Sequence, residues 1–287
     1  MNGAGTRHVV RGVILVLASL QWGCAHRYAV RGLVVAKVPG QNALVISHDE
    51  IPNFMGAMTM SFLVQRQESV EDFQPGDQVE FQLVVGRDSS YARRIRLSAG
   101  EPITSALTGR LPALPASPEQ LAVGEPVVDC KLVDQDSRLV RLAEWRGKLV
   151  VMNFIYTRCP LAQVCPLQAA NFSRLQKRFS QELGKKLMLL SVSLDPQYDT
   201  PEVLTRYAEA WHAKPEGWRF LTGSASQVAA VTRQFGIVYW PEEGSLTHTS
   251  GTAVLGADGR LKAFVEGPSY NAERLGDLIV HFLEDGS

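Results

Sequence analysis

The chain has 287 residues, which is long for one compact unit, so two domains are the natural expectation. Its hydrophobic content of 45% and charged content of 20% are those of an ordinary globular protein and exclude a disordered or fibrous one. Lysine plus arginine equals aspartate plus glutamate at 29 residues each, and this balance argues against a nucleic-acid binder.

Residues 1–25 have the pattern of an export signal. Arg7 and Arg11 precede the apolar run GVILVLASL, which is too short to cross a bilayer by itself. Cleavage after Ala25 is one expectation, and the other is that Cys24 accepts a lipid, as in bacterial lipoproteins. Both predict a periplasmic or otherwise extracytoplasmic protein, and the second predicts a lipid anchor in a membrane.

Residues 27–98 have the pattern of an all-β domain. Short segments rich in β-branched residues are separated by the turn signals PGQN and PGD, and lie at 28–38, 42–48, 58–64, 78–85 and 90–98. Five short strands in about 70 residues suit a small OB-like barrel, closed or partly open.

Three of the six methionines lie in the stretch HDEIPNFMGAMTMSF, residues 48–62. Residues two apart on a strand share a face, so Met58 and Met60 point the same way. One interpretation is that these thioethers only fill the barrel core. The other rests on His48 and Met55, which flank the pair, because an imidazole with thioethers is a soft, neutral ligand set that selects Cu(I) over harder ions.

With ISHDEIPNFMGAMTMSF and FQPGDQVEF, this domain resembles the CusF-like periplasmic copper-binding domain, a small β-barrel with a His…Met-x-Met site. The resemblance implies that His48, Met58 and Met60 are copper ligands. The chain lacks the tryptophan that caps the metal in the best-known members. Met55 lies near that place, where it would supply a third thioether or leave the site more exposed.

Residues 99–122 contain four prolines and predict an extended linker, and residues 123–287 alternate between strand and helix patterns. We expect strands at 148–156 and 186–194, a hairpin at 252–267, and helices at 166–183, 199–211, 224–236 and 271–284. A strand, a cysteine-bearing loop and a helix, completed by a hairpin and a last helix, form an α/β thioredoxin-like layout. Cys130, in a strand-like segment, is expected to be a buried small hydrophobe.

Cys159 and Cys165 have five residues between them. An unbroken helix would separate their side chains by about 120° around its axis and about 9 Å along it, so the two sulfurs could not bind one ion from there. Pro160 prevents an ordinary helical start, and we therefore expect residues 160–164 to form a loop that folds back. With Pro166 at the first helical position, Cys165 lies at or near the N-cap, where the helix dipole favours a thiolate. Arg158 favours a thiolate at Cys159 in the same way. The pair is a disulfide, a redox couple or a metal site.

His248 lies in a polar loop before an apolar strand, and this junction faces the cysteine loop in thioredoxin-like layouts. Two thiolates and an imidazole hold both Cu(I) and Cu(II). A merely solvated loop histidine is the alternative.

The segments GKLVVMNFIYTRCP, VCPLQAANFSRLQ, LLSVSLDPQYDTPEVLTRYA and FLTG, with the histidine before LGADGRL, make residues 123–287 resemble the Sco/SenC family. These are thioredoxin-like copper proteins associated with maturing cytochrome c oxidase. The resemblance implies copper ligation by Cys159, Cys165 and His248, and it places Asp195 on the family's acidic motif. The family usually has three residues between its cysteines, whereas this loop has five.

The sequence therefore predicts a two-site copper metallochaperone that captures copper at the amino-terminal barrel. It would deliver copper to a copper-receiving oxidase subunit or another copper protein. The linker, at roughly 3.1 Å per residue, would reach ~75 Å, far enough for the two sites to meet. Two alternatives remain: a thiol–disulfide reductase, with Cys159 and Cys165 as a redox-active pair acting on a copper-protein client, and a copper-tolerance buffer without a client.

Overall fold

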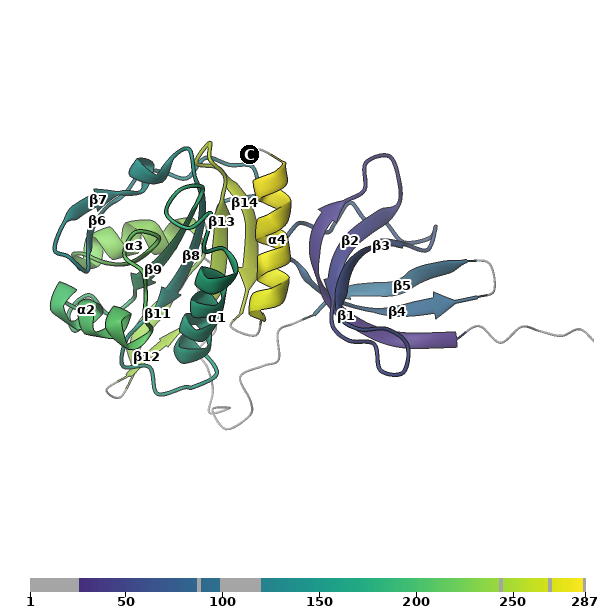
Figure 1. Cartoon of the computed structure of the whole chain (residues 1–287), viewed down its shortest axis with the longest axis horizontal. Helices are drawn as coiled ribbons and strands as arrows, with labels where there is room; N and C mark the ends of the chain where they lie inside the picture. The colour runs from purple at the N-terminus through teal and green to yellow at the C-terminus, as the bar shows by residue number, and fades with distance from the viewer. Residues whose placement is uncertain (1–25, 87–88, 99–119, 243–244, 268–269, 286–287) are drawn as a thin grey trace, which may run out of the picture.

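The computed structural model describes residues 26–86, 89–98, 120–242, 245–267 and 270–285. These form two domains that lie side by side (Figure 1). The expected export signal with Cys24, and the expected linker except for its last three residues, lie outside the described residues. Within the described ranges, no helix is long and apolar enough to cross a membrane.

The amino-terminal domain is a five-stranded antiparallel sheet in the order β3-β2-β1-β4-β5. Its strands coincide with the five expected segments and are β1 (His26–Lys37), β2 (Ala43–His48), β3 (Met58–Leu63), β4 (Gln78–Val85) and β5 (Ser90–Leu97). The outer strands β3 and β5 approach each other, but among the described residues only a single bridge, between Val64 and Ala92, joins this pair of edges. The all-β domain is therefore shown, whereas closure into an OB-like barrel is not.

Gly32 on β1 lies directly opposite His48 on β2. A Cβ at Gly32 would lie 2.4 Å from Ile46 Cγ2 and 2.7 Å from the Ser47 carbonyl oxygen. Only glycine therefore allows β1 and β2 to approach this closely, and this approach sets the position of the end of β2.

The carboxy-terminal domain is built on a seven-stranded sheet in the order β14-β13-β8-β9-β10-β6-β7. Its strands are β6 (Lys131–Asp134), β7 (Leu139–Arg141), β8 (Leu149–Ile155), β9 (Leu187–Ser193), β10 (Trp218–Thr222), β13 (Gly251–Leu255) and β14 (Leu261–Glu266). The other elements are η1 (Leu142–Trp145), α1 (Cys165–Arg178), α2 (Pro201–Ala210), α3 (Ala225–Gln234), α4 (Ala272–Glu284), and the separate pair β11 (Tyr239–Glu242) and β12 (Ser245–His248).

Two apolar cores lie on opposite faces of this sheet. Every residue of the central strands β8 and β9 is buried, as the continuous apolar runs predict for strands covered on both faces. The buried faces of α1, α2 and α4 belong to one core, and α3 and η1 contribute to the other. Cys130 belongs to the second core and lies beside Gln234, whose Nε2 is 3.3 Å from its sulfur, so the expectation of a buried cysteine is confirmed.

Several boundaries differ from the sequence expectation. The helix N-cap before the second cysteine is Val164, which makes Cys165 the first helical residue and Pro166 the second. The expected loop at His248 is wrong, because His248 ends β12 and pairs with Tyr239 of β11. Strands β10, β11 and β12 are too short and too mixed in composition to stand out as periodic segments.

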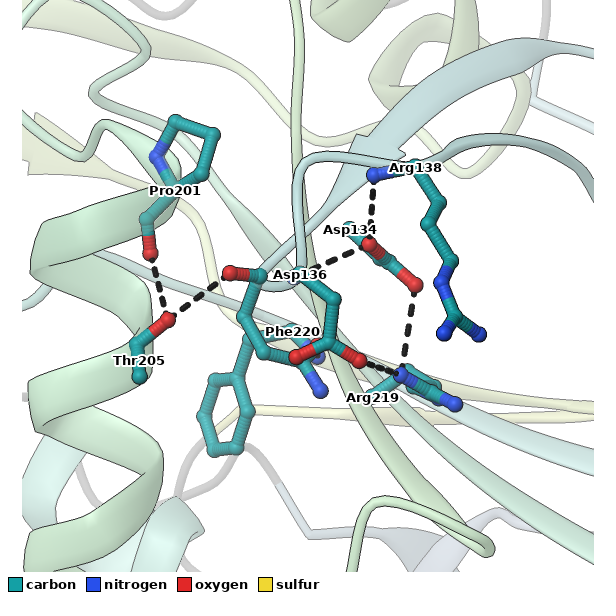
Figure 2. A network of polar contacts seen from close by, with 8 residues as sticks. Asp134, Asp136, Arg138, Pro201, Thr205, Arg219 and Phe220 are labelled. Carbon is teal, nitrogen blue, oxygen red and sulfur yellow. Dashed lines mark hydrogen bonds and ion pairs between the residues drawn. The ribbon is translucent and has the colours of Figure 1, made fainter.

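The turn between β6 and β7 is fixed by a polar network (Figure 2). Asp134 accepts the backbone N–H of Asp136 at 2.9 Å. Arg219 of β10 pairs with Asp134 at 3.2 Å and with Asp136 at 2.5 Å. Thr205 of α2 donates to the Gln135 carbonyl at 2.7 Å, so the network also holds α2 against this edge of the sheet.

The two domains are in direct contact through α4, which lies against β1 and β2 (Figure 1). Leu33 and Val35 of β1 are buried in the same apolar cluster as Leu275 and Ile279 of α4. The domains are therefore docked, in part through apolar contacts, an arrangement that the expected extended linker does not indicate.

Candidate metal centres

Cys159, Cys165 and His248 converge from three separate elements. Cys159 lies in the loop after β8, Cys165 is the first residue of α1, and His248 is the last residue of β12. The Cys165 sulfur lies 3.7 Å from His248 Nε2. Cys165 is fully buried and Cys159 is half-buried, and both carry free thiols in the structure.

The sheet order explains this convergence. β13 pairs with β8, with Thr252 opposite Asn153, so the chain just before β13 passes over the end of β8, where the cysteine loop begins. Tyr156, the first residue after β8, packs edge-on against the His248 ring at 5.6 Å between centroids. Its hydroxyl donates to the Leu246 carbonyl at 3.1 Å and so attaches β12 to the base of the loop.

A backbone carbonyl sets the protonation pattern of the His248 ring. Nδ1 lies 2.8 Å from the Thr249 carbonyl oxygen, which can only accept a hydrogen bond. Nδ1 therefore donates to this carbonyl, and Nε2, the nitrogen that faces Cys165, is the one left to interact with a thiolate or with a metal. Metal-binding histidines are commonly oriented in this way by a carbonyl on the far nitrogen.

The two thiols share a proton unequally. A hydrogen bond from the Cys165 side chain is the main reason that the pKa of Cys159 is lowered to about 4; burial opposes the shift, and a hydrogen bond with His248 adds to it. The hydrogen bond to Cys159 and burial raise the pKa of Cys165. The expectation that the helix N-terminus favours a thiolate at Cys165 is therefore wrong, because these two effects outweigh the dipole.

The donor set fits copper. For metal–sulfur and metal–nitrogen bonds of about 2.3 and 2.0 Å, a separation of 3.7 Å corresponds to an angle of about 120° at one ion. Among the described residues, however, no three His, Cys, Asp or Glu side chains are already arranged as a complete metal site. The three side chains already interact, because Cys165 and His248 both lower the pKa of Cys159. Formation of a three-ligand copper site would therefore need a shift of these side chains.

Acidic side chains fix the loop that carries Cys159. The buried Asp199 carboxylate accepts hydrogen bonds from Thr157 Oγ1 at 2.5 Å and from Ser193 Oγ at 2.5 Å. Arg158 pairs with Asp195 at 2.7 Å. The expectation that Arg158 favours a thiolate at its neighbour is therefore not met, since its charge is directed to Asp195. Thr157 gave no signal in the sequence, because it acts only through its carboxylate partner.

The histidine and methionines of the amino-terminal domain share one face of the sheet. His48 lies directly opposite Met58, and Met60 lies opposite Ile46, so all four point toward the interior of the curled sheet. Met58 is 52% exposed at the rim, whereas Met60 and Met55 pack in part against the core.

The His48 ring, like that of His248, is oriented by a backbone carbonyl that bonds its Nδ1. His48 Nδ1 lies 2.6 Å from the Asp49 carbonyl oxygen, so this nitrogen donates and Nε2 keeps the lone pair. The side chain is only 2% exposed, and Nε2 is buried without a hydrogen-bond partner. A buried nitrogen acceptor beside thioethers fits a soft cation better than it fits a packed core.

Helix α1 separates the two groups of donors. Its first residue is Cys165, and its last residue, Arg178, lines a cavity that His48 and Met58 also line. Thirteen helical steps between these ends correspond to about 20 Å. In the docked molecule, the two donor groups therefore do not meet.

Comparisons with known proteins agree with both domains. Residues 122–284 match the family model described as SCO1/SenC, and residues 27–96 match the model described as copper binding periplasmic protein CusF. The SCO1 protein homolog of Bacillus subtilis (strain 168) is 32% identical over 132 residues, which cover 45% of this chain and 67% of that protein. The mitochondrial SCO2 homolog of Bos taurus is 32% identical over 121 residues, 42% of this chain and 43% of that protein.

A solved structure of a SCO1/SenC family lipoprotein from Bacillus anthracis str. Ames has a TM-score of 0.50 at 24% identity. It covers 56% of this chain and 99% of that chain, and supports the thioredoxin-like fold. The matches confirm copper as the metal and support an extracytoplasmic location. Because the SCO1/SenC model matches more than half of the residues, the chain belongs to the SCO1/SenC family, and it carries a CusF-like copper-binding domain at its amino terminus.

Proposed function

We propose that this protein is an extracytoplasmic copper carrier with two sites. The amino-terminal domain captures Cu(I) at His48, Met58 and Met60, with Met55 as a further thioether. The carboxy-terminal domain holds copper at Cys159, Cys165 and His248 and delivers it to the copper centre of a respiratory oxidase. The observation that carries the proposal is His248 Nε2, which lies 3.7 Å from the Cys165 sulfur while Nδ1 is held by the Thr249 carbonyl. A lipid on Cys24 anchors the carrier to the membrane.

The ligand chemistry gives copper a direction. Thiolates bind Cu(I) more strongly than thioethers do, so copper moves downhill from the methionine site to the cysteine site. Because the two donor groups lie at opposite ends of α1, this movement requires the domains to separate first or a second molecule to receive the ion. The linker, rather than the docked arrangement, then allows the two sites to reach each other.

A thiol–disulfide reductase is the second candidate, and the low pKa of Cys159 favours it. A thiolate at Cys159 beside a buried thiol at Cys165 is also the arrangement of an attacking and a resolving cysteine. His248 contributes to the low pKa of Cys159, so replacing His248 weakens both activities and does not by itself separate them.

The proposal is tested by anaerobic Cu(I) titration of the reduced protein against a competing chelator. We expect two equivalents for the parent, one for Cys159→Ser, one for Met58→Leu with Met60→Leu, and none for the triple variant. Cys130→Ala, which removes a thiol on the opposite face of the sheet, is the matched control and should bind two. Copper binding by the triple variant equal to that of the parent would refute both sites.

Delivery is tested separately from binding. In cells grown at low copper, the carrier proposal predicts that His248→Ala abolishes oxidase activity even when an external reductant keeps the client's cysteines reduced. If that reductant restores oxidase activity in the variant, the reductase is the correct reading. If deletion of the whole gene leaves oxidase activity unchanged, the protein is a buffer without a client.

A further inference from the structure

We infer that the carboxy-terminal domain is part of the amino-terminal copper site. Asp277 and Arg274 of α4 are positioning residues for His48 and the methionine strand, so copper capture and domain docking are coupled. This inference rests on the proposed role of His48, Met58 and Met60 as ligands, and it adds residues from another domain to their site.

A single carboxylate oxygen joins the two strands that carry the ligands. Ser47 Oγ and Thr59 Oγ1 each donate to Asp277 Oδ2 at 2.7 Å. Ser47 and Thr59 lie directly opposite each other on β2 and β3 and alternate with the expected ligands along those strands. The outward face is therefore fixed to α4, while the neighbouring residues point inward with their nitrogen and sulfur atoms.

The attachment matters because β3 is an outer strand of the sheet. In the part of the chain that the structure describes, β3 pairs along its length with β2 alone, apart from the bridge that follows its end. An outer strand held on one side has more freedom to shift than a central one. Asp277 supplies the second hold, at the position between Met58 and Met60.

A second contact from α4 reaches the imidazole. Arg274 pairs with the Asp49 carboxylate through both Nε, at 3.0 Å, and Nη2. The carbonyl of the same Asp49 accepts a hydrogen bond from His48 Nδ1 at 2.6 Å. Arg274 thus fixes the residue that orients the ring and leaves Nε2 free, and Nε2 is the buried nitrogen without a partner.

The charged side chains at this interface form ion pairs that are only partly exposed to water. Arg178 of α1 pairs with Asp277 Oδ1 at 2.7 Å, so Asp277 is held from both domains at once. Side chains from the two domains line a cavity of about 390 Å³, which His48 and Met58 border on one side and Arg178 and Arg274 on the other. Hydrogen bonds to charged groups in such places are stronger than those on an open surface.

Two consequences follow from linkage. Docking of α4 raises the affinity of the methionine site for Cu(I), and Cu(I) strengthens docking by the same factor. Separation of the domains, which is one of the two routes for copper movement to the cysteine site, therefore also weakens binding of the ion. Loss of the contacts between α4 and the amino-terminal domain therefore promotes the release of copper.

The test uses the full chain with Cys159→Ser and Cys165→Ser, so that only the methionine site binds Cu(I). We expect Asp277→Ala to raise the Kd for Cu(I), measured by chelator competition, about tenfold, within the range of coupling between sites. Asp277→Asn keeps an acceptor oxygen and should restore most of the affinity. Glu284→Ala, an exposed acidic residue on the same helix, is the matched control and should change nothing.

Ser47→Ala with Thr59→Val approaches the same contacts from the other domain. It should raise the Kd by a similar factor, and combining it with Asp277→Ala should add little. In the parent, but not in Asp277→Ala, Cu(I) should slow proteolytic cleavage between the domains. Unchanged Kd values in both Asp277→Ala and the double variant would overturn the inference.

The inference and the proposed function fail in different ways. If His48→Ala and Met58→Leu leave Cu(I) binding intact, the ligand assignment is wrong. If those changes abolish binding while Asp277→Ala has no effect on Kd, the ligands stand and only the role of α4 is refuted.

Discussion

Copper binding at the cysteine site should release one proton, because only one of the two thiols holds a proton at neutral pH. With a pKa of about 4, Cys159 is protonated in roughly one molecule in a thousand at pH 7, whereas Cys165 keeps its proton until a metal displaces it. The affinity for Cu(I) should therefore rise about tenfold per pH unit. Two ordinary thiols, with pKa values near 8.5, would release two protons and give a rise of about a hundredfold.

The assay is Cu(I) competition between pH 7 and 8, with the proton release measured in weakly buffered solution. The variant Met58→Leu with Met60→Leu is used so that only the cysteine site binds. Ultraviolet absorbance of the thiolate in the metal-free protein provides the control, since it should show one thiolate at pH 7. Release of two protons, or no thiolate absorbance at pH 7, would refute the assignment of the shared proton.

Three further predictions concern the framework of the sites. Gly32→Ala should weaken Cu(I) binding at the methionine site, because the added Cβ would collide with Ile46 of β2, the residue opposite Met60. Gly56→Ala, with open space around it, should leave the Kd unchanged, and chelator competition measures both. Thr200→Ala should lower the free energy of unfolding by about 1 kcal/mol in urea titrations, because the N-cap hydrogen bond of α2 is lost. Burial alone would raise the pKa of Asp277, but its hydrogen bonds to neighbouring donors outweigh burial and lower the pKa. The contribution of Asp277 to docking is therefore present above pH ~4 and lost as the pH falls further, so the radius of gyration should rise only in that acidic range.

The sequence predicted the main elements because their signals are local. The apolar runs of β8 and β9 and the alternation around Met58 and Met60 each depend on neighbouring residues alone. The proximity of Cys165 and His248 could be anticipated only through the fold class, because strand order, and not spacing, brings β13 beside β8.

What the sequence could not predict depends on contacts between distant segments. The pKa values of the two cysteines are set by burial and by each other, which a helix-dipole argument from Pro166 does not include. The docking of α4 on β1 and β2 involves Asp277, more than two hundred residues from Ser47. One acidic residue among several on an amphipathic helix carries no signal of that partner. The linker composition indicated reach and gave no information on docking.

The most direct test of the central claim is X-ray absorption at the copper edge of the Cu(I)-loaded protein, with the methionine site removed by Met58→Leu and Met60→Leu. The spectrum should report two sulfur atoms and one imidazole nitrogen around copper, and the nitrogen should disappear in His248→Ala. A spectrum with sulfur ligands only, unchanged by His248→Ala, would contradict the claim that Cys159, Cys165 and His248 hold one copper ion.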